Sequence, residues 1–388
     1  MLNGEGSMEY RKLGRTGVDV GVVGLGMEYL ESASEETVIS VVRAALDAGV
    51  NYFDLWMATP AVRDAMGKAI SGRRSEAFIA GHIGAVLKDG KTDRSRDAAI
   101  AGQNFDDFLK RVGIDYVDAA MLFFVDEPED FDRVFSPGGT ADLAVRMKEQ
   151  GKARFIGLSS HYAPTALRAV RTGLIDVLMF PVNPAFDLIQ PNLRIEALWE
   201  AETYARAAET KNPAVAVKRE LYMECARRGV AVIAMKPFAA GWLFRKDNPS
   251  GFALTPIQCL HYALSQPGVV AAVPGCRNVE ELKGCLAYLQ ADDATRSYGT
   301  IASNDLWKLQ GKCMYCDHCL PCPAGIDVGA VTRLLDAARS GVTPAIREEY
   351  RALDHHADEC TECGTCVERC PFSVEAIVNM REAQTVFG

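Results

Sequence analysis

The sequence predicts an α/β protein, a closed (β/α)8 barrel followed by a smaller helical domain rich in cysteine. Two observations support this prediction. Apolar, β-branched runs alternate eight times with stretches of helical period over the first 312 residues, and both the cysteine content and the charge change near residue 312. The chain has 388 residues, 48% of them hydrophobic and 24% charged, which is typical of globular proteins.

Eight segments are predicted as strands because each is apolar and bounded by turn residues. They are Val20–Met27, Asn51–Trp56, Ala77–Ile83, Val117–Phe124, Ala153–Ser160, Val177–Asn183, Val230–Pro237 and Val269–Gly275. Near-continuous apolar strands that alternate with helices are typical of a parallel sheet covered on both faces. Eight such units in succession favour a closed TIM barrel over an open doubly wound sheet.

Helical periodicity between the strands is clearest in residues 35–49, which end at Gly49. No Gly-x-Gly-x-x-Gly follows the first strand, which argues against a Rossmann fold. The segment Asn192–Val217 is longer than an ordinary connection, so it is expected to carry a helix of its own and to serve as a lid or docking element.

The part of the chain after residue 312 is acidic. It contains 12 Asp and Glu against 6 Arg and no Lys, so it carries -6 of the formal net charge of -9 and leaves -3 for the first 312 residues. Eight of the 12 cysteines also lie there. We therefore expect two domains, a barrel over residues 8–295 and a second domain over residues 296–388.

The eight cysteines form two runs, Cys-x2-Cys-x2-Cys-x2-Cys-Pro from residue 313 and Cys-x2-Cys-x2-Cys-x3-Cys-Pro from residue 360. This spacing is typical of bacterial ferredoxins, in which the fourth cysteine of each run binds the other cluster. The spacing predicts two [4Fe-4S] clusters. One is held by Cys313, Cys316, Cys319 and Cys370, and the other by Cys360, Cys363, Cys366 and Cys322.

Two tetrathiolate zinc sites are the alternative interpretation, since Cys-x2-Cys pairs also bind zinc. Zinc has no use for the third evenly spaced cysteine followed by Cys-Pro. The first run departs from the ferredoxin pattern by having two residues before its fourth cysteine, and 37 residues separate the runs. Residues 331–341 and 345–356 in that gap have helical periodicity, which predicts a helix-elaborated ferredoxin-like domain.

Composition also excludes several partners. No apolar run approaches the roughly 18 residues of a membrane span, and the acidic balance gives no basic footprint for nucleic acid. The first residues lack a positive segment followed by an apolar core, so a cytoplasmic location is expected.

Five segments together resemble the aldo-keto reductase family, in the branch that carries a C-terminal ferredoxin. They are MEYRKLGRTGVDVGVVGLGM, NYFD, KARFIGLSSH, AMKPFAAG and AVPGCRNVEEL. The resemblance implies a (β/α)8 barrel that transfers hydride between NADP(H) and a carbonyl. It also implies that residues 8–21 form a hairpin closing the bottom of the barrel.

That family uses an Asp, Tyr, Lys and His tetrad, and only the Asp is kept here. Asp54 matches it, whereas Thr59 stands at the Tyr position, Gly81 and His82 at the Lys position, and Phe123 or Phe124 at the His position. Since an imidazole can give and take a proton, His82 is a candidate acid or base. The alternative is that His82 fills the lysine space and hydrogen-bonds Asp54.

The resemblance further implies that Ser159 and Ser160 hold the carboxamide of NADP(H), with Asn183 at a neighbouring strand end as a further cofactor-binding candidate. Gly275, Cys276 and Arg277 are the remaining candidates for contact with its phosphate. The adenine end departs from the family pattern, and Arg277 alternatively is a solvated charge at a helix start.

Lys236 is a third catalytic candidate, able to bind an anion or carbonyl, or else to pair with Asp54. Further candidates at the barrel mouth are His161 and an apolar wall of Trp56, Met57, Phe123, Phe124 and Trp242.

Together these features predict an iron-sulfur oxidoreductase with a degenerate tetrad, passing electrons between two clusters and a small-molecule substrate or cofactor at the barrel mouth. A redox protein is the expected electron partner. The alternative is a catalytically silent barrel that serves as an electron-transfer or assembly subunit of a larger complex.

Overall fold

The computed structural model describes residues 7–188, 214–246, 252–299, 301, 311, 313–339 and 341–388. Contacts divide the chain into two compact units. The first comprises residues 1–181, 231–237 and 270–290, and the second comprises residues 182–230, 238–269 and 291–388.

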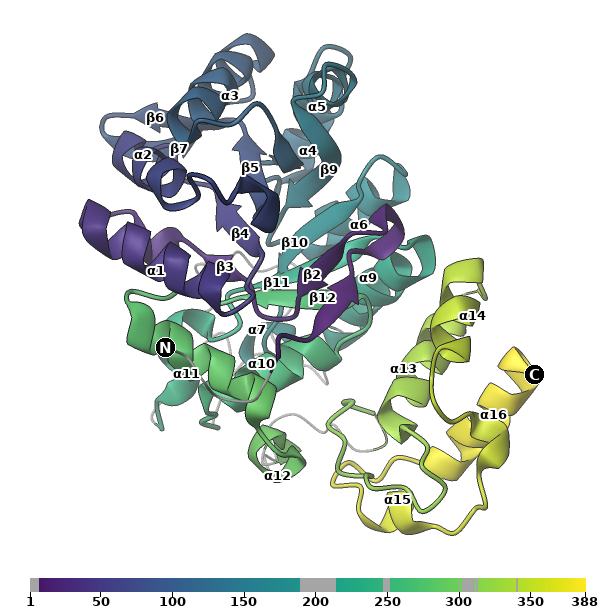
Figure 1. The fold of residues 1–388 in the computed structure, drawn as a ribbon. Helices are drawn as coiled ribbons and strands as arrows, with labels where there is room; N and C mark the ends of the chain where they lie inside the picture. The colour runs from purple at the N-terminus through teal and green to yellow at the C-terminus, as the bar shows by residue number, and fades with distance from the viewer. Residues whose placement is uncertain are drawn as a thin grey trace. The chain divides into compact units, whose positions relative to one another are not determined.

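Eight parallel strands form the barrel of the first unit (Figure 1). In spatial order they are β12 (Val269–Val273), β11 (Ala231–Met235), β10 (Val177–Pro181), β9 (Ala153–Ser159), β8 (Val117–Leu122), β5 (Phe78–Ile83), β4 (Tyr52–Leu55) and β3 (Leu25–Gly26). Parallel bridges from Val23 to Ala272 and from Gly26 to Gly275 join the two ends of the sheet. The predicted (β/α)8 fold is confirmed.

The first predicted strand is only partly correct. Residues 19–21 form β2 (Asp19–Gly21), which pairs antiparallel with β1 (Tyr10–Lys12), and only β3 belongs to the barrel. The two strands form the hairpin that the family resemblance implies. Leu13 and Val20 from this hairpin pack in the same buried cluster as Tyr52 and Phe78 of β4 and β5, so the hairpin supplies part of the barrel core.

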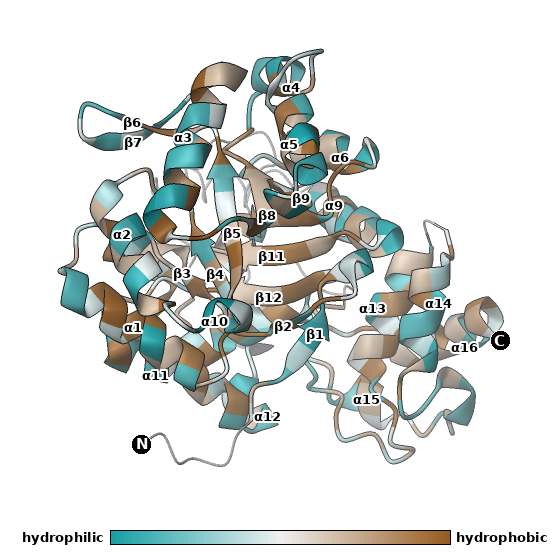
Figure 2. Ribbon diagram, turned by 45° about the horizontal axis from the view of Figure 1, so that its top comes forward, coloured by the Kyte–Doolittle hydropathy of each residue, from teal (hydrophilic) through white to brown (hydrophobic). Residues whose placement is uncertain are grey.

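Helices with one apolar face surround these strands. They are α1 (Glu35–Asp47), α2 (Pro60–Ala69), α3 (Ala98–Val112), α4 (Pro128–Val134), α5 (Thr140–Glu149), α6 (Ala163–Arg171) and α11 (Val279–Leu286). The α1 helix begins at the Ser34 N-cap, which accepts from the amide of Thr37, and Val38, Val41 and Val42 face the core. Figure 2 shows the brown strands and the two-sided colouring of these helices.

A second hairpin, β6 (Ala85–Lys88) and β7 (Lys91–Arg94), was not predicted. Most of its residues are exposed and polar, so it lacks the apolar run that identifies the barrel strands. It follows β5 directly, and Thr92 on β7 donates a hydrogen bond to Glu31.

The second unit is helical. It contains α7 (Pro184–Leu188), α9 (Ala214–Arg228), η5 (Ala239–Phe244), α10 (Pro256–Ser265), α12 (Asp293–Arg296), α13 (Val328–Ala338), α14 (Pro344–Arg351), α15 (Thr365–Glu368) and α16 (Ala376–Phe387). The helices predicted between the cysteine runs are confirmed as α13 and α14. The helix expected within residues 192–217 lies largely outside the described residues.

The core of the C-terminal part is built on α13 and α16. Val331, Leu334 and Leu335 of α13 pack with Met380 and Ala383 of α16, and all five are buried. Several cysteines of the two runs pack against this cluster, so the helices position the loops that carry them. No helix among the described residues is long and apolar enough to cross a membrane.

Candidate functional site

The two cysteine runs come together around two pockets in the second unit. Cys313, Cys316, Cys319 and Cys370 line one pocket, which also touches Cys366. Cys322, Cys360, Cys363 and Cys366 line the other. Each pocket therefore combines three cysteines of one run with the last cysteine of the other. We call them the Cys313 pocket and the Cys360 pocket.

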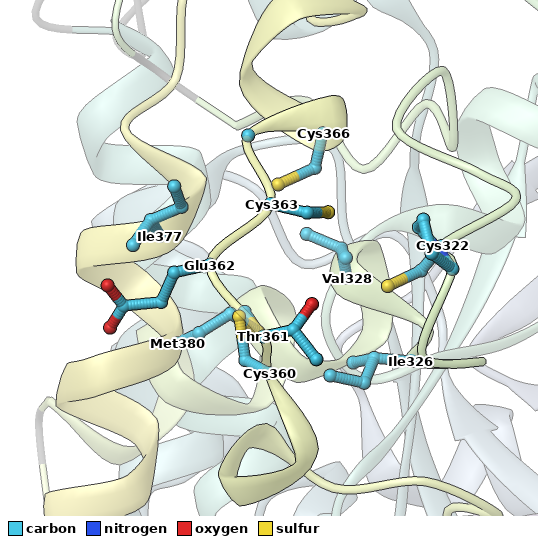
Figure 3. A pocket seen from close by; sticks show the side chains of 12 residues that line it. Cys322, Ile326, Val328, Cys360, Thr361, Glu362, Cys363, Cys366, Ile377 and Met380 are labelled. Carbon is cyan, nitrogen blue, oxygen red and sulfur yellow. The ribbon is translucent and has the colours of Figure 1, made fainter.

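Figure 3 shows the Cys360 pocket, with Cys322 on one side of the space and Cys360, Cys363 and Cys366 on the other. Ile326 and Val328, which follow the first cysteine run in the sequence, line this pocket. Ile377 and Met380 of α16 also line it. Met314, Phe372 and Val374 border the Cys313 pocket in the same way. Thiol donors in an apolar surrounding suit iron-sulfur clusters, because thiolates bind the iron and the apolar shell limits water.

Burial affects the thiols unequally. It raises the pKa of Cys313 and Cys316 to about 12, and also raises the pKa of Cys319 and Cys366. The pKa of Cys363 is lowered, mainly by its hydrogen bond with the Thr365 hydroxyl. A bound cluster requires thiolates, so cluster binding releases the protons that burial holds on these sulfurs.

Arg219 of α9 fixes the backbone of the first cysteine run. Its guanidinium donates to the carbonyl of Cys313 at 3.2 Å and also to Tyr315 and Asp336. The Tyr315 hydroxyl donates to Asp336 of α13 at 2.6 Å. A single cation thus ties the start of the Cys313 pocket to two helices.

The second run is held by its own charged contacts. Arg369 donates to the carbonyl of Pro321 at 2.9 Å, which links the two runs. Arg381 of α16 pairs with Glu362, and the Cys370 sulfur accepts from the amide of Val374 at 3.4 Å. These contacts were not foreseen, because sequence alone does not show which side chains meet across the two runs.

In the first unit, Asp54 and His82 form a buried pair at the ends of neighbouring strands. Asp54 lies on β4 and His82 on β5, and His82 Nε2 lies 2.8 Å from Asp54 Oδ1. Only 5% and 4% of the two residues are exposed. His82 Nδ1 is buried and has no hydrogen-bond partner among the described residues. Asp54 thus orients one ring nitrogen of His82, and the other is buried without a hydrogen-bond partner among the described residues.

Thr59, which the family resemblance aligns with the tetrad tyrosine, is engaged by a carboxylate. Its hydroxyl donates to Glu31, which also accepts from Thr92 at 3.1 Å. The Thr92 oxygen in turn accepts from the amide of Ala58 at 2.8 Å. Glu31 was missed by the sequence analysis, because its partners come from a loop and a hairpin distant along the chain.

Two of the three residues predicted near the nicotinamide of NADP(H) take part in internal contacts. Ser160 donates to Asp126 at 3.2 Å, and Asp126 also accepts from the backbone and ring of His161. Asn183 accepts from the amide of Phe186 and so caps α7. Ser159, the third, is buried at the end of β9. The sequence did not identify Asp126 as a site residue. Its position shortly after β8, at the carboxyl end of a barrel strand, could have indicated it.

The expected phosphate contact is likewise occupied by protein groups. Arg277 lies over the Tyr29 ring at 4.3 Å and pairs with Glu281, which also accepts from the Arg277 amide at 2.8 Å. The Tyr29 ring packs so close to Gly275 that a Cβ there would come within 2.6 Å of it. Lys236 is partly buried directly after β11, with a left-handed φ of 51°.

An aromatic row follows the ends of β4, β8 and β9. The rings of Trp56 and Phe123 stack at 5.8 Å, Phe123 and Phe124 lie 6.0 Å apart, and Phe124 meets His161 edge-on at 4.9 Å. His82 meets Phe123 edge-on at 5.5 Å. Trp56, Phe123 and Phe124 of the proposed wall thus pack together in the first unit, whereas Trp242 lies on η5 of the second unit.

Comparison with protein-family models gives two matches. Residues 19–257 match the aldo/keto reductase family, and residues 310–374 match the 4Fe-4S dicluster domain.

Among curated proteins, the chain is 28% identical to L-galactose dehydrogenase of Arabidopsis thaliana over 44% of this chain and 56% of that protein. It is 27% identical to the aldo-keto reductase YhdN of Bacillus subtilis over 39% of this chain and 47% of that protein. The matched segments thus span about half of each relative. The uncharacterized oxidoreductase YqkF of Bacillus subtilis is 24% identical over 74% of this chain and 92% of its own length.

Solved structures show the same fold. An aldo-keto reductase from Bacillus halodurans in its holo form superposes with a TM-score of 0.57 at 20% identity, covering 74% of this chain and 94% of that one. An aldo/keto reductase from Brucella melitensis gives a TM-score of 0.51 at 17% identity, covering 75% and 97%.

Proposed function

Because the chain belongs to the aldo/keto reductase family and carries a 4Fe-4S dicluster domain, we propose that it is an oxidoreductase with a degenerate tetrad. In this proposal electrons pass through two [4Fe-4S] clusters to or from a small molecule at the carboxyl ends of the barrel strands. Bound clusters supply one-electron transfer at a potential that burial and hydrogen bonding tune.

The grouping of the eight cysteines carries this proposal. Cys370 lines the same pocket as the first three cysteines of the first run, and Cys322 lines the same pocket as the first three of the second. This is the ligand exchange of two-cluster ferredoxins, and the apolar linings supply the surroundings that such clusters need. We assign four cysteines to each cluster accordingly.

In the barrel, His82 is the proposed proton carrier. Asp54 holds its Nε2, which leaves Nδ1 to give a proton to a ligand or take one from it. Asp54 is then a positioning residue, and Lys236 at the end of β11 is the proposed site for an anionic or carbonyl oxygen. Thr59 has no such role, since its hydroxyl already donates to Glu31.

The residues present fit NADP(H) poorly. Ser160, Asn183 and Arg277 are engaged by Asp126, Phe186 and Glu281, and the Tyr29 ring covers Gly275. We therefore derive no nicotinamide step. The proposed electron source is a redox protein, for which the acidic C-terminal part would provide a docking surface for basic groups.

The test begins with anaerobic reconstitution of the full chain and quantitation of iron and sulfide. The loaded protein is then titrated with NADPH, NADH and a reduced ferredoxin while the cluster absorbance is followed. The proposal expects eight iron and eight sulfide per chain, about four of each per cluster, and reduction by ferredoxin. Zinc without sulfide would refute it, and cluster reduction by NADPH would refute the assigned electron source.

A second candidate function is favoured by the same internal contacts. If the hydrogen-bonding groups of Thr59 and of the residues predicted to bind NADP(H) are all paired within the protein, the barrel has no catalytic role. The chain would then be an electron-transfer or assembly subunit. A loaded chain that exchanges electrons with a partner, but whose turnover never responds to changes at His82 or Lys236, would support this alternative.

A further inference from the structure

A buried polar cluster in the second unit has no role in the proposal above. Asp187 of α7 and Lys218 of α9 are 4% and 2% exposed. The carboxylate of Asp187 accepts from Tyr222 of α9 at 2.8 Å and from Tyr262 of α10 at 2.8 Å. Lys218 donates to the carbonyl of Phe186 and lies 3.7 Å from the centre of its ring.

This cluster is connected to the Cys313 pocket by two tyrosines. The rings of Tyr262 and Tyr298 meet edge-on, with centroids 5.3 Å apart. Tyr298 is fully buried, and its hydroxyl donates to the carbonyl of Met314. Met314 follows Cys313 and lines the same pocket. A continuous buried path therefore runs from Asp187 to the wall of the Cys313 pocket.

We infer that Asp187 takes up a proton when an electron enters the cluster site of the Cys313 pocket, with Tyr262 and Tyr298 as the polarisable link between them. This inference rests on the proposed function, because it needs a cluster in that pocket. In this inference the proton on Asp187 compensates the charge of the electron inside a buried region.

The physical reason is electrostatic. An added negative charge in a low-dielectric interior raises the proton affinity of a nearby carboxylate, and by reciprocity the protonated carboxyl favours the added electron. Asp187 is suited to this, since burial raises its pKa and burial also lowers the pKa of Lys218. The pKa of Asp187 is thus shifted upward toward neutral pH, and the pKa of Lys218 is shifted downward toward it.

Among the described residues, few other titratable groups surround Asp187. α9 contributes Lys218 and Tyr222, α10 contributes Tyr262, and η5, which also packs on α7, carries none. The pKa values of both tyrosines are raised well above the ordinary value, chiefly by burial, so they stay protonated as donors. Proton uptake near neutral pH is therefore assigned to the Asp187 and Lys218 pair.

The balance is one electron with one proton. An external one-electron reductant, such as a reduced ferredoxin-type protein, is oxidised and the cluster site is reduced. One proton moves from solvent to the Asp187 carboxylate, where an O–H bond forms, while the protonation of Lys218 does not change. No bond of the chain breaks, and the net charge of the buried region does not change.

The test is an EPR-monitored redox titration of the reconstituted full chain between pH 6 and pH 8. The midpoint potential of the Cys313-pocket cluster is expected to fall by up to about 59 mV per pH unit, the one-electron equivalent of a tenfold change in proton concentration. D187N should remove this slope. A D187N protein whose slope equals that of the wild type would overturn the inference.

Two matched variants test the link and protect against a folding failure of D187N. Y262F and Y222F each remove one hydroxyl that donates to Asp187, and Tyr262 is the one whose ring meets that of Tyr298 edge-on at 5.3 Å. Y262F should reduce the slope by at least half while Y222F retains it; equal slopes would exclude the tyrosine path.

Redox-difference infrared spectra should show a protonated carboxyl band on reduction that D187N lacks, and its absence in the wild type would refute proton uptake. A chain that binds no iron and sulfide would instead refute the proposed function.

Discussion

His82 Nε2 lies 2.8 Å from Asp54 Oδ1, on neighbouring strands of the barrel. The pair is buried, and its second ring nitrogen has no partner among the described residues. This arrangement orients an imidazole without consuming its ability to exchange a proton.

The first prediction concerns this pair. H82Q should lower kcat by about 10²–10⁴-fold on a substrate that requires proton transfer, the range for losing one general acid or base. Iron content and the rate of cluster reduction by ferredoxin should stay at the wild-type level. Steady-state turnover and stopped-flow reduction measure the two effects separately. H355Q is the control, since His355 is exposed and pairs only with Glu359 among the described contacts. Unchanged turnover of H82Q would remove His82 from the reaction.

The second prediction distinguishes crossed from uncrossed cluster ligation. The double variant C313A/C370A should lose one cluster and keep about four iron atoms per chain, because both cysteines line one pocket. C313A/C322A should lose both clusters, since these cysteines line different pockets although they belong to one run. Iron and sulfide quantitation after reconstitution gives the answer.

C259A is the control for these variants, because Cys259 is a buried thiol outside both pockets. It should retain both clusters. Uncrossed ligation would give the reverse result, with one cluster in C313A/C322A and none in C313A/C370A.

The third prediction concerns Arg219, which ties α9 to the first cysteine run. R219M should lower the free energy of unfolding by about 2 kcal/mol, the scale of hydrogen bonds made by a charged group. It should also slow cluster insertion, because the Cys313 carbonyl and Asp336 lose their shared donor. Thermal unfolding and reconstitution rates measure these effects. R347M, at an exposed position on α14, should behave as the wild type. Equal stability of the two variants would contradict the prediction.

Much of the barrel was predictable because its strands are buried on both faces and appear as apolar runs. The division of residues 20–27 between β2 and β3 was not, since the hairpin and the barrel strand are both apolar there. The β6–β7 hairpin was missed because it is polar and exposed. Its partner Glu31 was missed for a related reason, since no local pattern marks a carboxylate whose partners are distant in sequence.

The cysteine sites were more predictable than the barrel site. Ligand spacing is a local property, and the two pockets group the cysteines as the Cys-Pro pattern predicts. By contrast, the contacts that engage Ser160, Asn183 and Arg277 depend on tertiary structure. The buried Asp187 and Lys218 left no mark in the sequence, because burial of a charged residue follows from the packing of α7, α9 and α10.

The last prediction concerns stability in acid. Hydrogen bonds from Arg227 and from Arg228 lower the pKa of Glu224 to about 2. Desolvation by burial raises this pKa but is outweighed by the two hydrogen bonds. A carboxyl whose folded pKa lies below its unfolded value stabilises the fold above the unfolded pKa, and this contribution is lost as the pH falls through the folded one. Glu224 should therefore contribute to stability above about pH 4.5 and lose that contribution toward pH 2.

E224Q should be less stable than the wild type at pH 6, and the difference should shrink steadily as the pH approaches 2. Urea unfolding at pH 6, 4 and 2.5 measures this, with E348Q as the control because Glu348 lies exposed on α14. A difference that is the same at all three pH values would show that E224Q acts through packing and not through the charge of Glu224.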